Sequence, residues 1–398
     1  MRIIFVTNLE LWSMGMGKGG EAFTQTIKKY KNDNNLVYLV SDIAKNQKTN
    51  IINPKYNILV KPSFAKKFIH IRKIGLLFRY IDHFITTYRF EKAIIRIINQ
   101  KKDVQTVLYA YEVNGVKACK NVSMRFKLPL VTRFQGTKMV SYQYTWRNRI
   151  LRYPHYQALG TAADLIIMTD DGTKGAEILD NIGNQSPRLF LKNGLDLMKN
   201  DAAIDASELR SRYVKNAGDT IFLTVSRLTG WKRVDRVIHG FADYLRQGGK
   251  GKLIIVGDGD CRTFLEELAC DLKISENIYF TGAVKHEDVY KFMACADVFL
   301  SFFDMSNVGN PLLEAMTIGK CIVTYDVGDT KKLINGSNGV LLTAQTLHRL
   351  GDVMLELSQN PQKRENLGKK AKEYAMANFM TWEKRMDIEY EAVLSLGH

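Results

Sequence analysis

The sequence feature that most constrains the fold is a series of short, unbroken runs of Val, Ile and Leu, each followed by a longer stretch of helical periodicity. Apolar runs bounded by Gly or Asp are typical of parallel strands that are buried on both faces. Because strands and helices alternate, we predict an α/β protein built from βαβ units. The expected strands are residues 3–7, 36–40, 107–111, 130–134 and 165–169 in the first half and 221–225, 252–256, 278–281, 298–302 and 321–325 in the second.

Chain length and polarity indicate two domains. The chain has 398 residues, about twice or more the length of one ordinary domain. The segment 200–219 is polar and strandless, and we expect it to lie between two nucleotide-fold domains. No apolar run reaches the roughly 18–20 residues of a membrane span. Asn8 and Glu10 interrupt the first run too early for a signal peptide, so a cytoplasmic protein is expected.

The charge is more unusual than the length. The chain has 57 Lys and Arg against 41 Asp and Glu, a net charge of +16, which favours anionic partners. Residues 61–102 hold eleven basic and two acidic residues, or +9 of that total. Two interpretations of this segment stay open: a basic, aromatic helix on the anionic inner face of the cell membrane, or a helix packed on the sheet with solvated charges. Its apolar residues at three- and four-residue steps are Phe64, Phe68, Ile71, Phe78, Ile81, Ile85 and Tyr88.

Several partners and cofactors are not expected. The sequence has no zinc-ligand spacing, basic–aromatic RNA motif or helix-turn-helix signature, so nucleic acid is not a predicted partner. Asp258 and Asp260 could pass for a metal-chelating pair of carboxylates. However, they follow a buried run and flank Gly259, which favours a tight strand-to-helix turn. Residues 15–20 do not form a proper dinucleotide-binding glycine pattern. We therefore predict neither a metal nor a cofactor.

The chemistry is expected between residues 224 and 314. Arg227 follows a predicted strand and Lys232 comes five residues later, which places two cations where ligands bind in α/β proteins. They suit a departing diphosphate, whose negative charge grows as its bond breaks. Further along, Asn310 is a good helix cap and Pro311 suits the first helical position, so the helix start is a candidate anion site. Glu314, one turn inside, could accept hydrogen bonds from a ribose diol.

Taken in order, these motifs resemble the retaining GT-B glycosyltransferases of family four, also called glycosyltransferase group 1. The resemblance implies two Rossmann-like domains that face each other across a cleft: residues 1–198 on the acceptor side and residues 199–372 on the nucleotide-sugar side. Residues 373–398, with Trp382, would form a helix that returns to the first domain. The matching positions are Arg227 with Lys232, Gly257–Gly259, Phe280 and Gly282, Gly309, Leu312–Met316 and Gly319, and, less sharply, Gly19–Glu21 and Asn193–Asp196.

The resemblance also implies an activity. A sugar would move from a nucleotide-diphosphate donor, with a UDP-sugar favoured, to a hydroxyl of a glycan or lipid-linked acceptor in cell-surface polysaccharide synthesis. Anomeric configuration would be retained and no metal used. Arg227 and Lys232 would hold the diphosphate and Glu314 the ribose, as the catalytic set. The other implied donor-binding residues are Gly19 and Gly20 over the phosphates, Gly257 in the glycine turn, Ala283 and Val284 at the base, and Ser306, Asn307, Val308, Gly309, Asn310, Leu312 and Gln135 around the sugar and the β-phosphate.

The sequence departs from the family's pattern at two positions. Ser306 stands where the family's motif, a Glu, seven residues and a second Glu, begins. Asp304 and Asn307 remain as nearby candidates for contact with sugar hydroxyls. Gln135 stands where many relatives have a histidine near the reacting sugar; its amide can hydrogen-bond but cannot act as acid or base. Two alternatives therefore stay open: a non-catalytic glycan-binding or chaperone subunit of a transferase complex, and a GT-B sugar-nucleotide epimerase.

Overall fold

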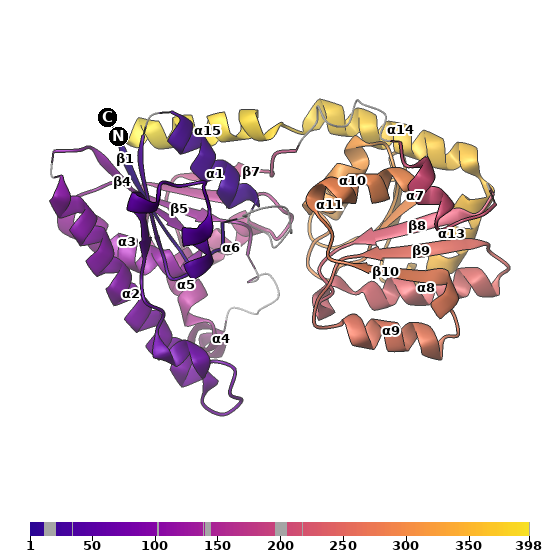
Figure 1. Ribbon diagram of the computed structural model, residues 1–398, viewed down its shortest axis with the longest axis horizontal. Coiled ribbons are helices and arrows are strands. Elements are labelled where there is room, and N and C mark those ends of the chain that lie inside the picture. Colours follow the sequence, from indigo (N-terminus) through magenta and orange to yellow (C-terminus); the bar gives the residue numbers. More distant parts are fainter. Residues whose placement is uncertain are drawn as a thin grey trace.

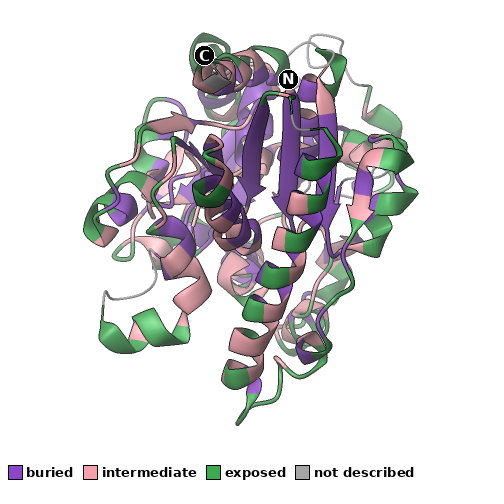
Figure 2. Ribbon diagram, turned by 90° about the vertical axis from the view of Figure 1, so that its left-hand side faces the viewer, coloured by how far each residue is buried: buried purple, intermediate pink, exposed green. Residues whose placement is uncertain are grey.

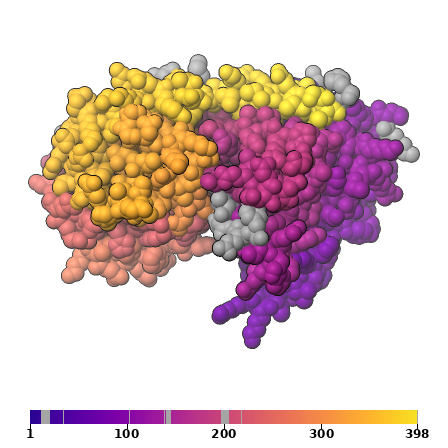
Figure 3. All heavy atoms as spheres, turned by 180° about the vertical axis from the view of Figure 1, so that it is seen from behind, coloured from indigo at the N-terminus to yellow at the C-terminus, as the bar shows by residue number. Residues whose placement is uncertain are grey.

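The computed structural model describes residues 1–11, 21–33, 35–101, 103–137, 139, 145–195, 205–216 and 218–397. In this part of the chain two α/β domains lie side by side, and the C-terminal helices run along one side of both (Figure 1). Each domain is built on one parallel sheet, so the predicted fold class is confirmed. In the space-filling view the two lobes join beneath those helices and separate on the opposite side (Figure 3).

The first domain has a seven-stranded sheet in the order β3-β2-β1-β4-β5-β6-β7. Helices α2 and α3 cover one face, whereas α1 and the last helix, α15, cover the other. The strands are β1 (Arg2–Thr7), β2 (Leu36–Ser41), β3 (Asn57–Leu59), β4 (Thr106–Tyr111), β5 (Leu130–Phe134), β6 (Leu165–Thr169) and β7 (Arg188–Leu191). The helices are α1 (Glu21–Asn32), α2 (Gly75–Gln100), α3 (Val113–Phe126), α4 (Trp146–Leu151), α5 (Tyr153–Leu159) and α6 (Gly175–Ile182), and the short helix η3 (Phe64–Lys67) precedes α2.

The second domain has a six-stranded sheet in the order β10-β9-β8-β11-β12-β13. Helices α7, α10, α11 and α14 pack on one face and α8, α9 and α13 on the other. The strands are β8 (Thr220–Val225), β9 (Gly251–Val256), β10 (Ile278–Gly282), β11 (Val298–Ser301), β12 (Cys321–Tyr325) and β13 (Val340–Leu342). The helices are α7 (Ser207–Ser211), α8 (Val234–Arg246), α9 (Arg262–Asp271), α10 (His286–Cys295), α11 (Asn310–Thr317), α12 (Thr330–Leu333), α13 (Leu350–Gln359) and α14 (Pro361–Asn378), followed by α15 (Trp382–Leu394).

The structure adds detail at both ends of the second domain. The described part of the polar segment 200–219, from Asp205, has no strand but includes α7, which Arg210 ties to the second domain by an ion pair to Asp297 at 3.0 Å. The expected end of that domain at residue 372 falls inside α14. Ala371 and Ala375 both pack in the core of the second domain, so the chain leaves this domain only after α14.

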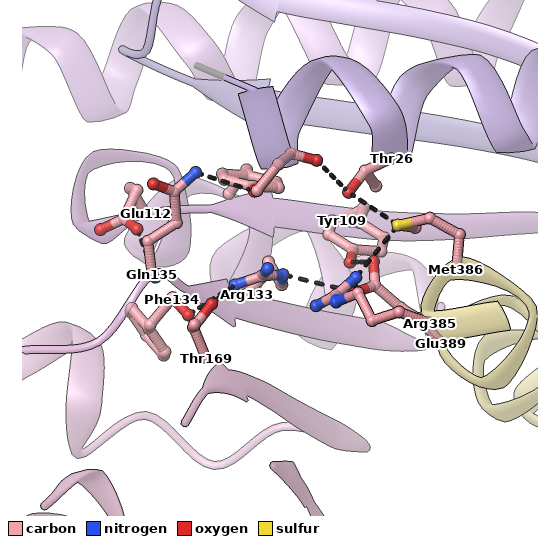
Figure 4. A network of polar contacts seen from close by, with 12 residues as sticks. Thr26, Tyr109, Glu112, Arg133, Phe134, Gln135, Thr169, Arg385, Met386 and Glu389 are labelled. Carbon is pink, nitrogen blue, oxygen red and sulfur yellow. Dashed lines mark hydrogen bonds and ion pairs between the residues drawn. The ribbon is translucent and has the colours of Figure 1, made fainter. Parts of the chain in front are cut away.

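Helix α15 returns to the first domain, where a buried polar network holds it (Figure 4). Glu389 lies fully buried between the side chains of Arg133 and Arg385. Its carboxylate accepts hydrogen bonds from the Tyr109 hydroxyl at 2.5 Å and from Arg385 at 2.5 Å, and its distance to Arg133 Nε is 3.4 Å. Arg133 lies on β5 and Tyr109 on β4. The network therefore fixes α15 to the two strands at the centre of the first sheet.

Candidate active site

The two domains touch through loops that follow the carboxyl ends of their strands. Asn193, just after β7, donates a hydrogen bond of 2.9 Å from Nδ2 to Oδ1 of Asn310 at the start of α11. The Ser306 hydroxyl, after β11, donates to the backbone carbonyl of Asp171, after β6. Ligands bind at the carboxyl ends of parallel strands in this class of fold. The candidate site is therefore the region between these loops.

Lys232 lies at the mouth of the second sheet, enclosed by aromatic rings. Its Nζ is 3.9 Å from the centre of the Trp231 ring and 3.5 Å from the centre of the Phe303 ring. Burial and the nearby charge of Arg227 lower the pKa of Lys232 to about 7, and the charge of Asp171 opposes this shift. The structure thus brings Arg227 and Lys232 together, next to the loop that leads into α11. A cation whose charge is disfavoured in this way gains most from an incoming anion.

The loop before α11 is held by its own polar side chains. Asn307 is fully buried: its Oδ1 accepts hydrogen bonds from Ser301 Oγ at 2.7 Å and from the backbone N–H of Phe303 at 3.0 Å. Asp304 is paired with Arg236 at 2.7 Å and with Arg233 at 3.4 Å. Both side chains that the sequence offered for contact with sugar hydroxyls are therefore engaged within the protein.

The start of α11 offers fewer free N–H groups than expected. The helix cap is Gly309 and not Asn310. The N–H of Val308 donates to Ser306 Oγ at 3.0 Å, and that of Leu312 donates to the carbonyl of Gly309 at 3.0 Å. The backbone N–H groups of Gly309 and Asn310 donate to no atom in the described part of the chain. Of the expected N–H groups, these two and that of Asn307 have no acceptor in the described part of the chain, whereas those of Val308 and Leu312 shape the turn.

Ser306 has a different setting from the one expected. Its hydroxyl is used in the hydrogen bond to Asp171, so it is not directed at a donor sugar. The loops approach so closely that a Cβ on Gly172, where φ is +77°, would lie 2.5 Å from Ser306 Oγ. A Cβ on Gly328 would lie 2.3 Å from the carbonyl oxygen of Gly172. Two glycines thus allow the domains to meet here.

Glu314 has a partner that the sequence did not reveal. Its side chain is buried, and its Oε1 lies 2.9 Å from Nε2 of His286. His286 begins α10, two residues after Val284, so this contact brings the segment with Ala283 and Val284 beside Glu314. The expected base-binding and ribose-binding residues therefore lie together. A single histidine carries no spacing signal, which is why sequence reasoning missed it.

Gly257 permits a close contact between two turns at the same edge. Its N–H donates to the carbonyl of Gly282 at 3.0 Å. A Cβ at this position would lie 1.8 Å from the carbonyl oxygen of Ser226, which directly precedes Arg227. Gly257 therefore supports the cation-bearing loop by packing. The neighbouring Asp258 belongs to no metal cluster, since no group of three or more metal-ligating side chains was found among the described residues.

Gln135 lies at the carboxyl end of β5 in the first domain (Figure 4). Its amide nitrogen donates to the Tyr111 hydroxyl at 3.1 Å, and its backbone N–H donates to Oε1 of Glu112 at 2.6 Å. Glu112 adopts φ of 65°, which is uncommon for a residue other than glycine. No described contact joins Gln135 to the second domain. Gly19 and Gly20, and the rest of residues 15–20, lie outside the described residues.

Comparison with known proteins finds similar sequences and a matching family model for the second domain. Residues 205–374 match the family described as glycosyl transferases group 1. An uncharacterized glycosyltransferase of Methanocaldococcus jannaschii is 28% identical over 280 residues, which cover 68% of this chain and 69% of that protein. The alpha-monoglucosyldiacylglycerol synthase of Streptococcus pneumoniae is 30% identical over 175 residues, 43% of this chain and 39% of that synthase. This alignment thus spans well under half of the streptococcal protein.

Solved structures agree on the fold over nearly the whole chain. HepE of Anabaena in complex with UDP-glucose superposes with a TM-score of 0.75 at 18% identity and covers 99% of this chain and 100% of HepE. The architecture is therefore that of the GT-B glycosyltransferases, as predicted. A glycosyltransferase enzyme was predicted, and both the match of residues 205–374 to the glycosyl transferases group 1 model and the names of the similar proteins support it.

Proposed function

We propose that this enzyme moves a sugar from a nucleotide-diphosphate donor, with a UDP-sugar favoured, to a hydroxyl of a glycan or lipid-linked acceptor, in cell-surface polysaccharide synthesis. The observation that carries the proposal is the gathering of Arg227, Lys232 and the two free N–H groups before Pro311 at one edge of the second sheet. Glu314 and His286 lie at the nucleoside end of the same edge. Cations and amides at one end and a carboxylate at the other match a nucleoside diphosphate.

The proposed chemistry is retaining and independent of metal. Arg227, Lys232 and the N–H groups of Gly309 and Asn310 stabilise the charge that grows on the departing diphosphate. A phosphate oxygen of this leaving group takes the proton of the acceptor hydroxyl, on the same side of the sugar from which the diphosphate departs. This step needs no side-chain base, so an amide at Gln135 is compatible with it. The sugar's configuration is then preserved.

Two of the similar proteins support the substrate class. HepE of Anabaena forms a complex with UDP-glucose, and the streptococcal relative is named as a synthase of a glucosyl diacylglycerol. A sugar nucleotide as donor and a lipid-linked hydroxyl as acceptor are therefore the first substrates to test here.

The donor half of the proposal is tested by transfer assays with Lys232→Ala and Glu314→Ala. Losing one stabilising group for the leaving diphosphate should lower kcat by roughly 10²–10³-fold in Lys232→Ala, with the fold intact by circular dichroism. NMR of the product reports the anomeric configuration, and full activity in EDTA is expected. A wild-type protein that binds no nucleotide sugar would instead favour the non-catalytic subunit. Interconversion of sugar nucleotides without transfer would favour the epimerase.

The basic segment supplies the proposed membrane contact. The C-terminal half of α2 packs on the first sheet through its own residues, such as Phe90 and Ile94. Toward its N-terminal end the helix is more exposed (Figure 2). The predicted stripe is not one helix, since η3 ends at Lys67 and α2 begins only at Gly75. The second interpretation of the basic segment, packing on the sheet, therefore applies only to the C-terminal half of α2. We call η3, the N-terminal part of α2 and the residues between them the tip. The exposed apolar residues of the tip are Phe64, Phe68, Ile71, Ile74 and Leu77.

Helix α4 enlarges this tip. The Tyr80 hydroxyl donates a 2.5 Å hydrogen bond to the carbonyl of Ile150, which joins α2 to α4. Trp146 on α4 is 75% exposed, and Leu77 on α2 is 60% exposed. Aromatic and aliphatic side chains flanked by Lys and Arg fit the interface of an anionic bilayer. The exposed basic residues of the tip and α4 are Lys67, Arg72, Lys73, Arg79, Arg147 and Arg149. Among the described residues, no helix is long and apolar enough to cross a bilayer.

Flotation with vesicles tests this contact. The protein should float with vesicles that contain phosphatidylglycerol and not with pure phosphatidylcholine. The variant Arg72→Glu/Lys73→Glu should lose flotation, as should Leu77→Asp alone. Lys66 is left unchanged because it pairs with Asp42 at 2.7 Å. The control Lys369→Glu/Lys370→Glu makes the same charge change on exposed residues of α14 and should float normally. Equal behaviour of both double variants would remove the membrane proposal.

A further inference from the structure

Asp171 lies where the two domains touch, in the loop after β6. Its carbonyl oxygen accepts the hydrogen bond from Ser306 of the second domain. Its neighbour Gly172 packs against the same loop, since a Cβ there would lie 2.5 Å from Ser306 Oγ and 2.9 Å from a methyl carbon of Val308. The backbone of Asp171 is therefore held by both domains at once.

The carboxylate of Asp171 is held as firmly as its backbone. Oδ1 accepts hydrogen bonds from Thr173, at 2.6 Å from the hydroxyl and 3.1 Å from the backbone N–H. Oδ2 lies against Gly136, where an added Cβ would approach it to 2.1 Å. No other described residue donates a hydrogen bond to Oδ2. One carboxylate oxygen is thus used for orientation, and the second remains available as an acceptor.

Asp171 lies between the groups that should surround the transferred sugar. Gly136 follows Gln135 in the first domain, and the charge of Asp171 is felt by Lys232 in the second. Burial raises the pKa of Asp171 to about 6, against the hydrogen bonds from Thr173. At neutral pH the group is therefore still mainly a carboxylate, which can only accept hydrogen bonds.

We propose that Asp171 contacts the transferred sugar and helps to select it: Oδ2 accepts hydrogen bonds from sugar hydroxyls while Lys232 holds the attached diphosphate. This inference rests on the proposed function. The facing loop offers no substitute, because Asp304 is paired with arginines, Asn307 is buried and Ser306 is bonded to Asp171 itself. A carboxylate of the first domain then hydrogen-bonds to a sugar whose nucleotide is bound by the second domain.

Calorimetry on Asp171→Asn tests the proposal. The probes are UDP with UDP-glucose and GDP with GDP-mannose, so that each nucleotide sugar is compared with its own nucleoside diphosphate. The variant should bind the preferred nucleotide sugar about 10- to 100-fold more weakly than wild type, as expected for a hydrogen bond to a charged group. Its affinity for the nucleoside diphosphate should stay within about twofold. Asp170→Asn, which neutralises the adjacent exposed carboxylate paired with Lys192, should change neither.

A second variant guards against a defect in folding. Thr173→Val removes the hydroxyl that orients the carboxylate, so it should shift the same ratio of affinities in the same direction by a smaller factor. Equal weakening of both ligands would mean that Asp171 only joins the domains, and equal strengthening that it is only a counter-charge to Lys232. Either result would overturn the inference alone. A wild-type protein that binds none of the four probes would overturn the proposed function together with it.

Discussion

Two groups of charges in this molecule are built in opposite ways. In the first domain, Glu389 is fully buried with Arg133 and Arg385, and its carboxylate contacts both guanidinium groups. In the second domain, Lys232 lies between two aromatic rings with Arg227 as its charged neighbour. No carboxylate lies within salt-bridge distance of Lys232 in the described part of the chain. The carboxylate of the first group is paired within the protein, although Nε and Nη2 of both arginines have no hydrogen-bond partner among the described residues. Lys232 in the second group has no such pair, and in the proposed function the diphosphate of the donor supplies it.

The pKa values express this difference. Burial alone would raise the pKa of Glu389, but the charges of Arg385 and Arg133 outweigh it and hold the pKa below the usual value. At Lys232 burial and Arg227 act in the same direction and lower the pKa to about 7. The carboxylate of Glu389 is thus stabilised by its partners in the native protein, whereas the charge of Lys232 is disfavoured by its surroundings. The comparison teaches that a buried charge is a functional candidate mainly when its neighbours fail to neutralise it.

The largest expected effect is on stability, in Glu389→Ala. This change leaves Arg133 and Arg385 buried without their carboxylate, which should lower the free energy of unfolding by about 3–5 kcal/mol. Urea denaturation of the two proteins measures the difference. Donor affinity of the folded fraction should be measured separately, because Arg133 Nη1 also donates to Phe134 O and Thr169 Oγ1, which directly precede Gln135 and Asp170.

The matched control is Glu383→Ala, in the first turn of the same helix, where the side chain is exposed. It should change the free energy of unfolding by less than about 0.5 kcal/mol. A loss in Glu389→Ala no larger than in this control would show that the buried network does not hold α15. The contrast between the two charge groups would then fail.

A smaller effect should appear in the pH dependence of binding. Since the free protein has a Lys232 pKa of about 7, binding of UDP above that pH must be accompanied by uptake of a proton. The dissociation constant should therefore rise by up to about tenfold per pH unit above 7, until the pKa of the complex is reached. Asp171 is already ionised in this range, so it adds no titration. Calorimetry in buffers of different ionisation enthalpy measures the proton count directly.

Lys232→Arg supplies the control, because arginine keeps its charge throughout this range. Its affinity for UDP should vary little between about pH 7 and 9. Stability gives a second check on the sign. In wild type the unfolded chain keeps a proton on Lys232 that the native protein releases above pH 7, so this residue makes stability rise with pH from 7 toward 10.5. Parallel pH profiles for the two proteins would place the titrating group elsewhere.

Much of the fold follows from hydrophobic patterning alone. All ten predicted strands are present within one residue at each end, because buried parallel strands are continuous apolar runs. The three that were missed, β3, β7 and β13, lie at the sheet edges. Two of them are only three residues long, and β7 carries half-exposed side chains. Short edge strands have too few buried residues to produce such a run.

The candidate site was less predictable than the fold. The sequence predicted the positions of Arg227 and Lys232 and the helix that contains Glu314. Each of these predictions depends only on residues nearby in sequence. His286 and Asp171 carry no such signal: one meets Glu314 across 28 positions, and the other meets Ser306 across 135. Their importance arises only when the loops at the strand ends come together. Sequence patterning likewise could not show that Asn307 turns inward, because its three partners are set by the tertiary packing of the loop.

The smallest expected effect concerns His286. It tests whether Glu314, at the proposed nucleoside end of the site, needs its histidine partner in order to bind the ribose. Its ring lies 2.9 Å from Glu314 and contacts Tyr290 with ring centres 5.3 Å apart. His286→Phe keeps an aromatic ring but removes the hydrogen bond that orients the carboxylate, a net contribution of about 1 kcal/mol. UDP should then bind about fivefold more weakly, and its advantage over 2′-deoxy-UDP should shrink by the same factor. His239→Phe, on exposed α8 surface, should change neither value. If His286→Phe weakened both nucleotides equally, Glu314 would not contact the ribose through the geometry that His286 sets.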